Sequence, residues 1–163
     1  MRLSKDIYIK VEERTLVIIK PDGIQRHLAG RIIDRFEKKG FKLVAAKFMK
    51  ISQAIAKKHY AVHKNKPFFE NLTKYLASSP VLIMVWQAKG VIEMTRKMLG
   101  ATFGIQADPG TIRGDFSCSK GYNLVHGSDS PVSAEMEIKL FFDSQEIIDY
   151  DFTDEQWLYG KND

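Results

Sequence analysis

Short apolar runs alternate with segments of helical periodicity along most of the chain. Continuous apolar residues indicate β-strands at residues 16–19, 41–51, 81–86 and 122–125, at most four strands in all. Apolar positions three or four residues apart indicate helices at residues 30–39, 52–63, 69–76, 91–99 and from residue 131 onward. Strands that alternate with helices in this way predict a layered α/β or α+β fold, in which helices pack on one sheet.

Local signals mark where several of these elements begin and end. Pro21-Asp22-Gly23 is a turn signal after the first strand, and Gly40 is a natural stop for the helix before it. Ser52 is a candidate N-cap, and Ser130 followed by Pro131 gives an N-cap with proline at the first helical position. We therefore expect helices to start directly after both serines.

Two segments lack a long regular element. Residues 100–121 are glycine-rich and polar, and loops of this length in compact domains are often functional. Residues 149–163 are interpreted as an extended C-terminal arm, with an apolar anchor formed by Trp157, Leu158 and Tyr159. Because no repeat, low-complexity tract or linker divides the chain, we expect residues 1–163 to form a single domain.

The composition narrows the class of protein without selecting a function. The 163 residues are 44% hydrophobic and 28% charged, as in an ordinary globular protein, and no apolar run suits a membrane span or a signal peptide. The formal net charge of +5 favours anionic partners, namely nucleotides, nucleic acid or acidic membrane surfaces. A single cysteine, Cys118, excludes an internal disulfide, and we expect a cytoplasmic protein.

The familiar phosphate-binding and nucleophile motifs are missing from the sequence. No glycine-rich loop ends in Gly-Lys-Ser/Thr, no Gly-x-Gly-x-x-Gly follows a strand, and no Gly-x-Ser-x-Gly is present. His59 and His63 lie four residues apart on a predicted helix, a spacing that can chelate zinc. Catalytic zinc usually takes three protein ligands, so we interpret them as two histidines on a partly exposed helix and predict no metal site.

His126 has a different setting, at the end of a short apolar strand and before a helix start. Strand ends that open onto a helix N-terminus are common places for reactive groups in α/β proteins. Gly127 would leave room for a bulky ligand, and Glu137 would orient the imidazole from the next helix. An imidazole is a competent nucleophile near neutral pH when its other nitrogen is hydrogen-bonded. By spacing alone, a structural histidine is about as probable as a catalytic one.

The residues around this histidine carry a family resemblance. The run Asn123-Leu124-Val125-His126-Gly127-Ser128-Asp129 resembles the active-site signature of nucleoside diphosphate kinases, in which the histidine is phosphorylated. Residues 13–26, 66–69 and 109–116 match the same family in order and spacing. Four ordered motifs over nearly the whole chain make coincidence implausible.

The resemblance implies a fold and a reaction. The fold would be an α+β, ferredoxin-like βαββαβ sandwich, an antiparallel sheet covered by helices, with an added loop and the C-terminal arm. A nucleoside triphosphate would donate its γ-phosphate to His126, and a nucleoside diphosphate would then collect it in a ping-pong reaction. Such an enzyme maintains nucleoside triphosphate pools with broad base specificity. Mg²⁺ would be bound through the nucleotide phosphates rather than in a protein cage.

The matching positions also imply which residues bind the nucleotide. The phosphates would be held by Lys20, Arg96, Thr102 and Arg113. Phosphoryl transfer depends mainly on positioning and on stabilising charge on the phosphate oxygens, which suits these side chains. Phe68 would stack on the base, a contact that tolerates any base, and Leu72 would flank the phosphates or serve the core.

The remaining implied roles surround the histidine. Lys20 and Asn123 would meet the ribose 3′-hydroxyl, and Tyr60 would lie beside His126. Glu137, with help from Ser128, would fix the imidazole ring. Taken singly, each of these residues could instead be a surface charge, a core aromatic or a turn residue. Because they occur together and in the matching order, the functional interpretation is favoured.

The sequence departs from the family pattern at three places. Phe103-Gly104 follows Thr102 where many members have Asn or Asp and then Pro, which would loosen that loop. Lys120 stands where an apolar residue commonly sandwiches the base, and Tyr122 stands where Arg is frequent. In addition to these three departures, residues 1–12 form an N-terminal extension, for which an added edge strand or an arm on a neighbouring subunit is expected.

The implied partners and the alternatives complete the hypothesis. Family members are homo-oligomers, and the tail favours a hexamer over a tetramer; nucleic acid would be a secondary partner, and no membrane partner is expected. The alternatives are a nucleic-acid-binding protein and a non-catalytic interaction protein on the same scaffold. The sequence contains no nucleic-acid module. The intact set of matching site residues argues against an inactive scaffold.

Overall fold

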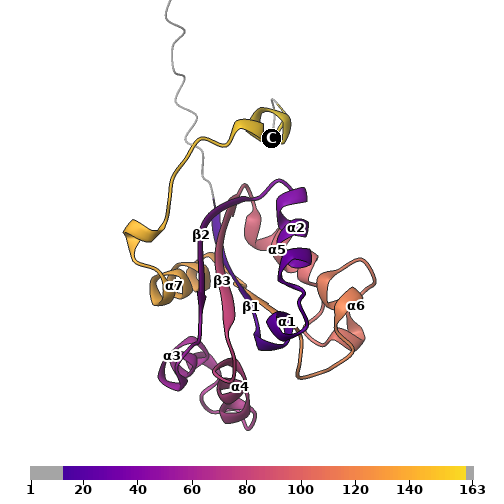
Figure 1. Ribbon diagram of the computed structural model, residues 1–163, viewed down its shortest axis with the longest axis vertical. Coiled ribbons are helices and arrows are strands. Elements are labelled where there is room, and N and C mark those ends of the chain that lie inside the picture. The colour runs from indigo at the N-terminus through magenta and orange to yellow at the C-terminus, as the bar shows by residue number, and fades with distance from the viewer. Residues whose placement is uncertain (1–12, 161–163) are drawn as a thin grey trace, which may run out of the picture.

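A computed structural model describes residues 13–160, and its four strands form one antiparallel sheet (Figure 1). The spatial order is β2-β3-β1-β4. The strands are β1 (Glu13–Ile19), β2 (Lys42–Met49), β3 (Val81–Ala88) and β4 (Val125–Gly127). All three strand pairs are antiparallel, with a register shift in β2 between Leu43 and Ala45. The α+β, ferredoxin-like prediction is confirmed.

Helices cover both faces of the sheet (Figure 1). They are α1 (Pro21–Gln25), α2 (Ala29–Lys38), α3 (Gln53–His59), α4 (Phe69–Leu76), α5 (Val91–Leu99), α6 (Ile112–Phe116) and α7 (Pro131–Phe141). Short 3₁₀ turns are η1 (Ala61–His63), η2 (Gly104–Gln106), η3 (Ser144–Glu146) and η4 (Thr153–Trp157). In the described part of the chain, no helix has both the length and the apolar character needed to span a membrane.

The central strands are apolar throughout because each of their faces meets a separate core. Val17 and Ile19 of β1 pack in one core, which includes Ile32 and Phe36 of α2. Leu16 and Ile18 point the other way, into a second core with residues of α3, α4 and α7. A strand buried on both faces has no polar positions to alternate with its apolar ones, so β1 and β3 appear in the sequence as continuous apolar runs.

The predicted caps form as expected. The Ser52 and Ser130 side chains accept hydrogen bonds from the backbone N–H groups of Ile55 (3.2 Å) and Ser133 (3.1 Å), at the starts of α3 and α7. Gly40 follows the end of α2 with φ of +87°, a left-handed conformation that glycine adopts at no steric cost.

Other boundaries differ from the predictions. Pro21-Asp22-Gly23 opens the short helix α1 instead of making a turn alone, since proline suits the first helical turn. The helix expected over 52–63 ends at His59, followed by η1. The last strand was expected at 122–125 but occupies Val125–Gly127, because Leu124 has φ of +68° and breaks the extended backbone.

The C-terminal segment is an arm that contains short turns and is not fully extended. It leaves α7, and Ile148 donates its N–H to the Val44 carbonyl of β2 (2.8 Å) before the segment reaches η4. Tyr159 accepts a hydrogen bond from the Lys89 backbone (3.2 Å), whereas Trp157 is 83% exposed. Of the predicted anchor residues, Tyr159 is therefore attached to the rest of the protein, whereas Trp157 is not buried. The N-terminal extension, 1–12, lies outside the described residues.

Candidate active site

Strand register determines the environment of His126. His126 pairs with Ile18 of β1, while its neighbours Val125 and Gly127 pair with Ile19 and Val17. Because side chains alternate across a strand, His126 lies on the face that α3, α4 and α7 cover, and its neighbours face α5. The imidazole is 20% exposed, so it is held by the protein yet open to a substrate.

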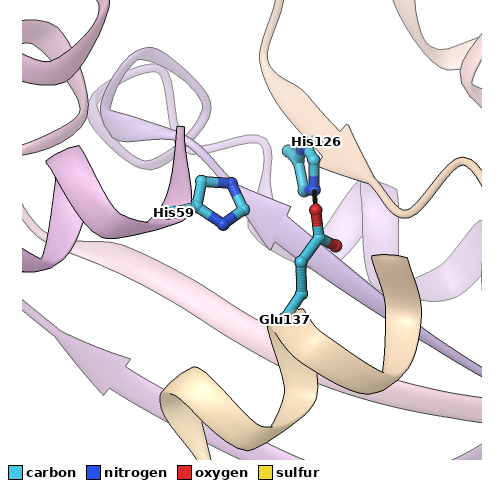
Figure 2. Close-up of side chains that lie close together, drawn as sticks. All are labelled: His59, His126 and Glu137. Atoms are coloured by element: carbon cyan, nitrogen blue, oxygen red, sulfur yellow. Dashed lines mark hydrogen bonds and ion pairs between the residues drawn. The ribbon is translucent and has the colours of Figure 1, made fainter. Parts of the chain in front are cut away.

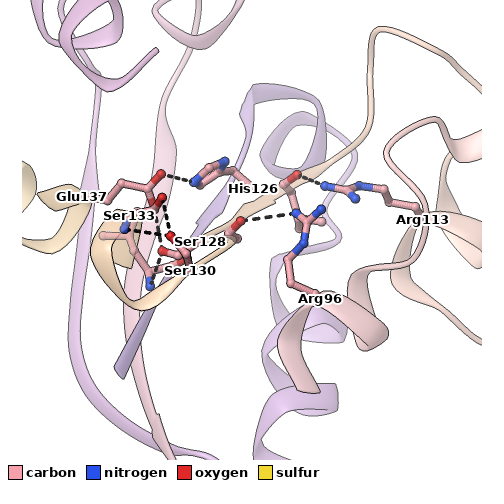
Figure 3. Close-up of polar contacts among 10 residues, drawn as sticks. Arg96, Arg113, His126, Ser128, Ser130, Ser133 and Glu137 are labelled. Carbon is pink, nitrogen blue, oxygen red and sulfur yellow. Dashed lines mark hydrogen bonds and ion pairs between the residues drawn. The ribbon is translucent and has the colours of Figure 1, made fainter. Parts of the chain in front are cut away.

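A carboxylate from α7 holds the imidazole (Figure 3). Nε2 of His126 lies 3.0 Å from Oε1 of Glu137, whose Oε2 accepts a hydrogen bond from Ser128 (2.6 Å). Ser128 is fully buried and also accepts the N–H of Leu16 (3.1 Å), so it is fixed to the central strand. The sequence predicts that these three side chains lie together, and they do so in the structure. Glu137 engages Nε2 of the imidazole, so Nδ1 is the ring nitrogen that this carboxylate does not contact.

Gly127 serves helix packing and not ligand binding, contrary to the sequence interpretation. A Cβ atom at this position would lie 2.8 Å from Leu99 Cδ1 and 3.2 Å from Thr95 Cγ2, both on α5. The absence of a side chain therefore lets α5 approach β4 closely. It opens no space near His126, because adjacent strand residues face opposite sides of the sheet.

Two aromatic rings from the end of α3 flank His126. The ring of His59 stands edge-on to it at a centroid distance of 4.5 Å, and the ring of Tyr60 lies 6.3 Å away. Tyr60 is buried, and burial raises the pKa of its phenol, so the group stays protonated at neutral pH. The predicted position of Tyr60 beside the histidine agrees with the structure.

His59 was missed as a site residue and is not on a partly exposed helix. It is 8% exposed, and burial together with the nearby His126 lowers its pKa to about 2, which keeps the ring neutral. A weak sequence signal existed, since His59 follows the apolar Ala56 by three residues and therefore shares its helical face. His63 is half-buried in η1 and contacts the Tyr60 ring at 6.1 Å.

Lys20 and Asn123 form a buried polar pair near the histidine strand. The Lys20 ammonium donates to Asn123 Oδ1 (2.7 Å), and Asn123 Nδ2 donates to the Thr102 carbonyl (2.8 Å). Burial, and next the charge of Arg113, lower the pKa of Lys20 to about 7. A lysine in this state gains its full charge when an anion arrives, as a phosphate group would do.

Arg113 is buried and already engaged with the backbone. Its guanidinium donates to the carbonyls of Asn123 (3.2 Å), Gly100 (2.8 Å), Ala101 (3.4 Å) and Val125 (2.8 Å). Burial and the neighbouring Arg96 lower its pKa to about 10, so it remains charged. Arg113 thus braces the histidine strand against residues 100 and 101, and these four bonds leave one of its five N–H groups.

The other predicted ligand residues differ in exposure. Arg96 is exposed on α5, with one contact to the Gly127 carbonyl at 3.5 Å (Figure 3), and Thr102 is exposed in the loop after that helix. Phe68 is 49% exposed and touches the His63 ring at 5.7 Å. Leu72 is half-buried against the second core, in agreement with the expectation that it could serve the core.

Asp22 and Leu124 are support residues that sequence reasoning missed. One carboxylate oxygen of Asp22 accepts the Tyr75 hydroxyl and the other accepts the N–H of Leu124 (3.1 Å). Burial, and next the bond to Asp22, raise the pKa of Tyr75. The carboxylate thereby stabilises the left-handed backbone of Leu124 two residues before His126. The sequence places Asp22 in a turn signal and in a stretch that matches the family, without a role of its own.

The departure at Phe103-Gly104 is a packing feature and does not loosen the loop. Gly104 is buried and donates its N–H to the Ser119 carbonyl (3.1 Å). A Cβ atom there would lie 2.3 Å from Ser117 Oγ and 2.4 Å from its carbonyl oxygen. Tyr122 stands edge-on to Tyr75 at a centroid distance of 5.1 Å, and Lys120 is exposed. The glycine keeps the loop that carries Thr102 in close contact with residues 117–119.

The fold and the site together define a class of protein: an α+β group-transfer enzyme with a fixed histidine at its centre and cationic side chains nearby. A carboxylate holds one imidazole nitrogen, as covalent catalysis through histidine requires. Lys20, Arg96 and Arg113 are basic side chains of the kind that suits an anionic substrate.

Comparisons with known proteins identify the family within this class. The family model for nucleoside diphosphate kinase matches residues 13–147. A nucleoside diphosphate kinase from Carboxydothermus hydrogenoformans is 53% identical over 147 residues, which are 90% of this chain and 99% of that protein. The chain therefore belongs to the nucleoside diphosphate kinase family, and its activity is the transfer of the γ-phosphate of a nucleoside triphosphate to a nucleoside diphosphate.

Solved structures agree with this assignment. The chain is similar to a halophilic nucleoside diphosphate kinase from Halobacterium salinarum in complex with CDP, with a TM-score of 0.90, 46% identity, and coverage of 91% of this chain and 99% of that one. It is also similar to a transition state mimic of the Borrelia burgdorferi enzyme with bound vanadate and ADP, with a TM-score of 0.84, 39% identity, and coverage of 89% and 95%.

Proposed function

We propose that Nδ1 of His126 is the atom that carries the phosphoryl group. The observation that supports this most directly is the 3.0 Å contact between Nε2 and Glu137, since it leaves the Nδ1 lone pair unprotonated. In the first half-reaction, this lone pair bonds to the γ-phosphorus and the bond to the β-phosphate oxygen breaks. In the second, a terminal oxygen of another nucleoside diphosphate takes the phosphoryl group and the P–N bond breaks.

Glu137 has an electrostatic role in both steps. When Nδ1 bonds to phosphorus while Nε2 keeps its proton, the imidazole ring becomes cationic. The carboxylate beside it stabilises this charge, and Ser128 keeps the carboxylate in place. When the phosphoryl group leaves, the ring returns to its neutral form without any proton transfer to solvent.

The nucleotide would lie across the residues that the family pattern assigns. Lys20, Arg96, Thr102 and the free N–H of Arg113 would bind the phosphates, and Lys20 with Asn123 would meet the ribose 3′-hydroxyl. Phe68, half-exposed, would stack on the base. Stacking makes no hydrogen bonds to the edge of the base, so it does not distinguish one base from another. This supports broad base specificity and a role in maintaining nucleoside triphosphate pools.

Mg²⁺ is the cofactor that this chemistry implies, and the residues fit an ion carried by the phosphates. Within residues 13–160, His126 belongs to a group of three possible metal ligands together with His59 and Glu137. This group offers two imidazoles and one carboxylate, whereas Mg²⁺ prefers oxygen ligands. Basic side chains, which suit the phosphates and not a cation, surround the remaining space. When bound, Mg²⁺ would neutralise negative charge on the nucleotide phosphates.

We also propose a cytoplasmic homohexamer formed by single-domain chains of residues 1–163, with the 1–12 extension and the 149–163 arm attached. The lone Cys118 suits a reducing compartment. Exposed apolar side chains, including Val132, Met136 and Ile148, provide surface for subunit contacts. Light scattering distinguishes a hexamer of about 112 kDa from a tetramer of about 75 kDa, for a chain of 18.7 kDa.

Intact-protein mass spectrometry after brief exposure to Mg-ATP tests the proposed chemistry. We expect one added phosphate that is lost in acid, is removed by GDP, and is absent from His126→Ala. Phosphate that persists in the variant would refute the role of His126. If the native chain gains none, the non-catalytic alternatives, including nucleic-acid binding, move to the front; no finding favours them at present.

A further inference from the structure

The imidazole of His59 is buried beside the nucleophile and has no assigned part in phosphoryl transfer. Neither of its ring nitrogens has a hydrogen-bond partner, and both are inaccessible to solvent. Buried polar atoms are usually partnered, so both nitrogens of this imidazole are available to a ligand. His59 belongs to α3, whereas His126 and Glu137 come from β4 and α7.

These three side chains converge on one point (Figure 2). One nitrogen of each histidine and one carboxylate oxygen of Glu137 all lie within 4.8 Å of one another. Zinc bonds to nitrogen and oxygen are about 2.0–2.1 Å, so the ligand atoms of a tetrahedral site are about 3.3 Å apart. The pair His126–Glu137 is already at 3.0 Å, and the farthest pair needs to close by no more than about 1.5 Å.

We propose that His59, His126 and Glu137 form a His₂Glu site for Zn²⁺, and that this ion inhibits the enzyme. Two imidazoles with one carboxylate are a known ligand set for catalytic zinc, in which the fourth position is left for water. The neutral His59 ring can turn toward the ion without breaking a hydrogen bond, because it makes none. The partly exposed imidazole of His126 provides the entry path.

The mode of inhibition follows from the ligand set. Zn²⁺ would engage the nucleophilic imidazole and the carboxylate that holds it, so neither group remains available for the phosphoryl group. Mg²⁺ would not compete at this site, since it prefers oxygen ligands. Zinc binding is independent of the proposed function, whereas inhibition through this site rests on the proposed role of His126.

Two measurements on the full chain without nucleotide test the site. Isothermal titration with Zn²⁺ measures affinity and stoichiometry, and the visible spectrum of added Co²⁺ distinguishes tetrahedral from octahedral coordination. We expect one tight Zn²⁺ per chain and a tetrahedral Co²⁺ spectrum. His59→Gln should weaken Zn²⁺ binding by about 100-fold, because two ligands replace three. His63→Gln, a neighbouring histidine outside the cluster, is the matched control and should bind as the native chain does.

Kinase assays in Mg-ATP with added Zn²⁺ give the second readout, each variant being compared with its own uninhibited rate. The concentration for half-inhibition should rise about 100-fold in His59→Gln and stay unchanged in His63→Gln. Should His59→Gln unfold, His126→Ala serves instead in the titration and should lose the tight site. Equal Zn²⁺ affinity in native chain, His59→Gln and His126→Ala, or an octahedral Co²⁺ spectrum, would overturn the proposal. Tight binding without phosphohistidine formation would overturn only the proposed catalytic role.

Discussion

Ile18 and His126 stand opposite each other across the β1–β4 pair, and this register directs the imidazole toward α3 and α7. A slip of one residue would send His126 toward α5 and bring Gly127 to the site. The short strand β4 is held in register by the buried central strand and by Ser128, which bonds to the backbone of Leu16. The environment of the nucleophile is therefore a consequence of strand pairing.

Replacing Ser128 by alanine should slow catalysis through Glu137. The hydroxyl orients the carboxylate that holds His126, so we expect kcat to fall about 10-fold while KM for nucleotides changes little. The orphaned N–H of Leu16 should also lower the free energy of unfolding by about 1–3 kcal/mol. Steady-state kinetics and denaturant titration measure the two effects. Ser133→Ala, in the helix that carries Glu137 but without a bond to it, should keep the native kcat.

Lys20 should take up a proton when a nucleotide binds. Its pKa of about 7, lowered first by burial, means that most of this side chain is neutral at about pH 8 in the free enzyme. A bound phosphate raises that pKa and recharges it. Calorimetry of ADP binding in two buffers of different ionisation enthalpy should reveal uptake of up to about one proton, which Lys20→Met abolishes. Equal uptake in that variant would contradict the assignment.

The same group links pH to stability. The unfolded chain keeps this proton up to about pH 10.5, whereas the folded chain releases it near pH 7, so the unfolded state binds more protons between these values. The free energy of unfolding contributed by Lys20 therefore rises with pH across this window and is constant below it. Denaturation at several pH values should give a flatter profile for Lys20→Met than for the native chain.

The left-handed backbone of Leu124 should reverse the usual order of alanine and glycine. Both substitutions remove the same buried side chain, at a cost of about 2–5 kcal/mol. Glycine also relieves the φ of +68°, so Leu124→Gly should be about 1 kcal/mol more stable than Leu124→Ala. Leu99, buried at the end of α5, is the control, where glycine should be less stable than alanine. Thermal unfolding of the four variants tests whether the order of glycine and alanine is reversed at residue 124.

The sequence alone predicted the layered fold and the helix caps, because those depend on apolar periodicity and local hydrogen bonds. Ser52 and Ser130 cap their helices as expected. Spacing did not decide whether His126 is catalytic; the matching motifs did. The family resemblance supplied the ferredoxin-like topology, since strand order depends on contacts between residues far apart in the chain.

What sequence reasoning missed lies in three-dimensional contacts between elements. His59 is buried because its ring packs against His126 of β4 and Phe141 of α7, contacts that the weak signal of helical spacing does not specify. The interpretation of Gly127 as space for a ligand is wrong, because strand alternation turns this residue away from the His126 side chain and toward α5. The support of Leu124 by Asp22 joins residues 102 positions apart, beyond the reach of any local pattern.

Gly104 should be intolerant of a side chain, because a Cβ atom would meet the backbone of Ser117 as well as its hydroxyl. Gly104→Ala should destabilise the protein by about 1–3 kcal/mol, the usual cost of overpacking a tight site. Gly30 in α2 is the control, since a Cβ atom added there would have no neighbour within 4 Å, and alanine should stabilise the helix by about 0.5–1 kcal/mol. Denaturant unfolding compares the two.

The Gly104 substitution should also reach the nucleotide site. The loop it anchors carries the Thr102 carbonyl, which accepts the Asn123 amide, and Asn123 in turn accepts the Lys20 ammonium. A displaced loop should therefore raise KM for nucleotides in Gly104→Ala, with phosphohistidine formation still detectable at saturating Mg-ATP because His126, Glu137 and Ser128 lie on other elements. Native stability and native KM in this variant would show that the loop shifts freely, as the glycine in place of proline first suggested.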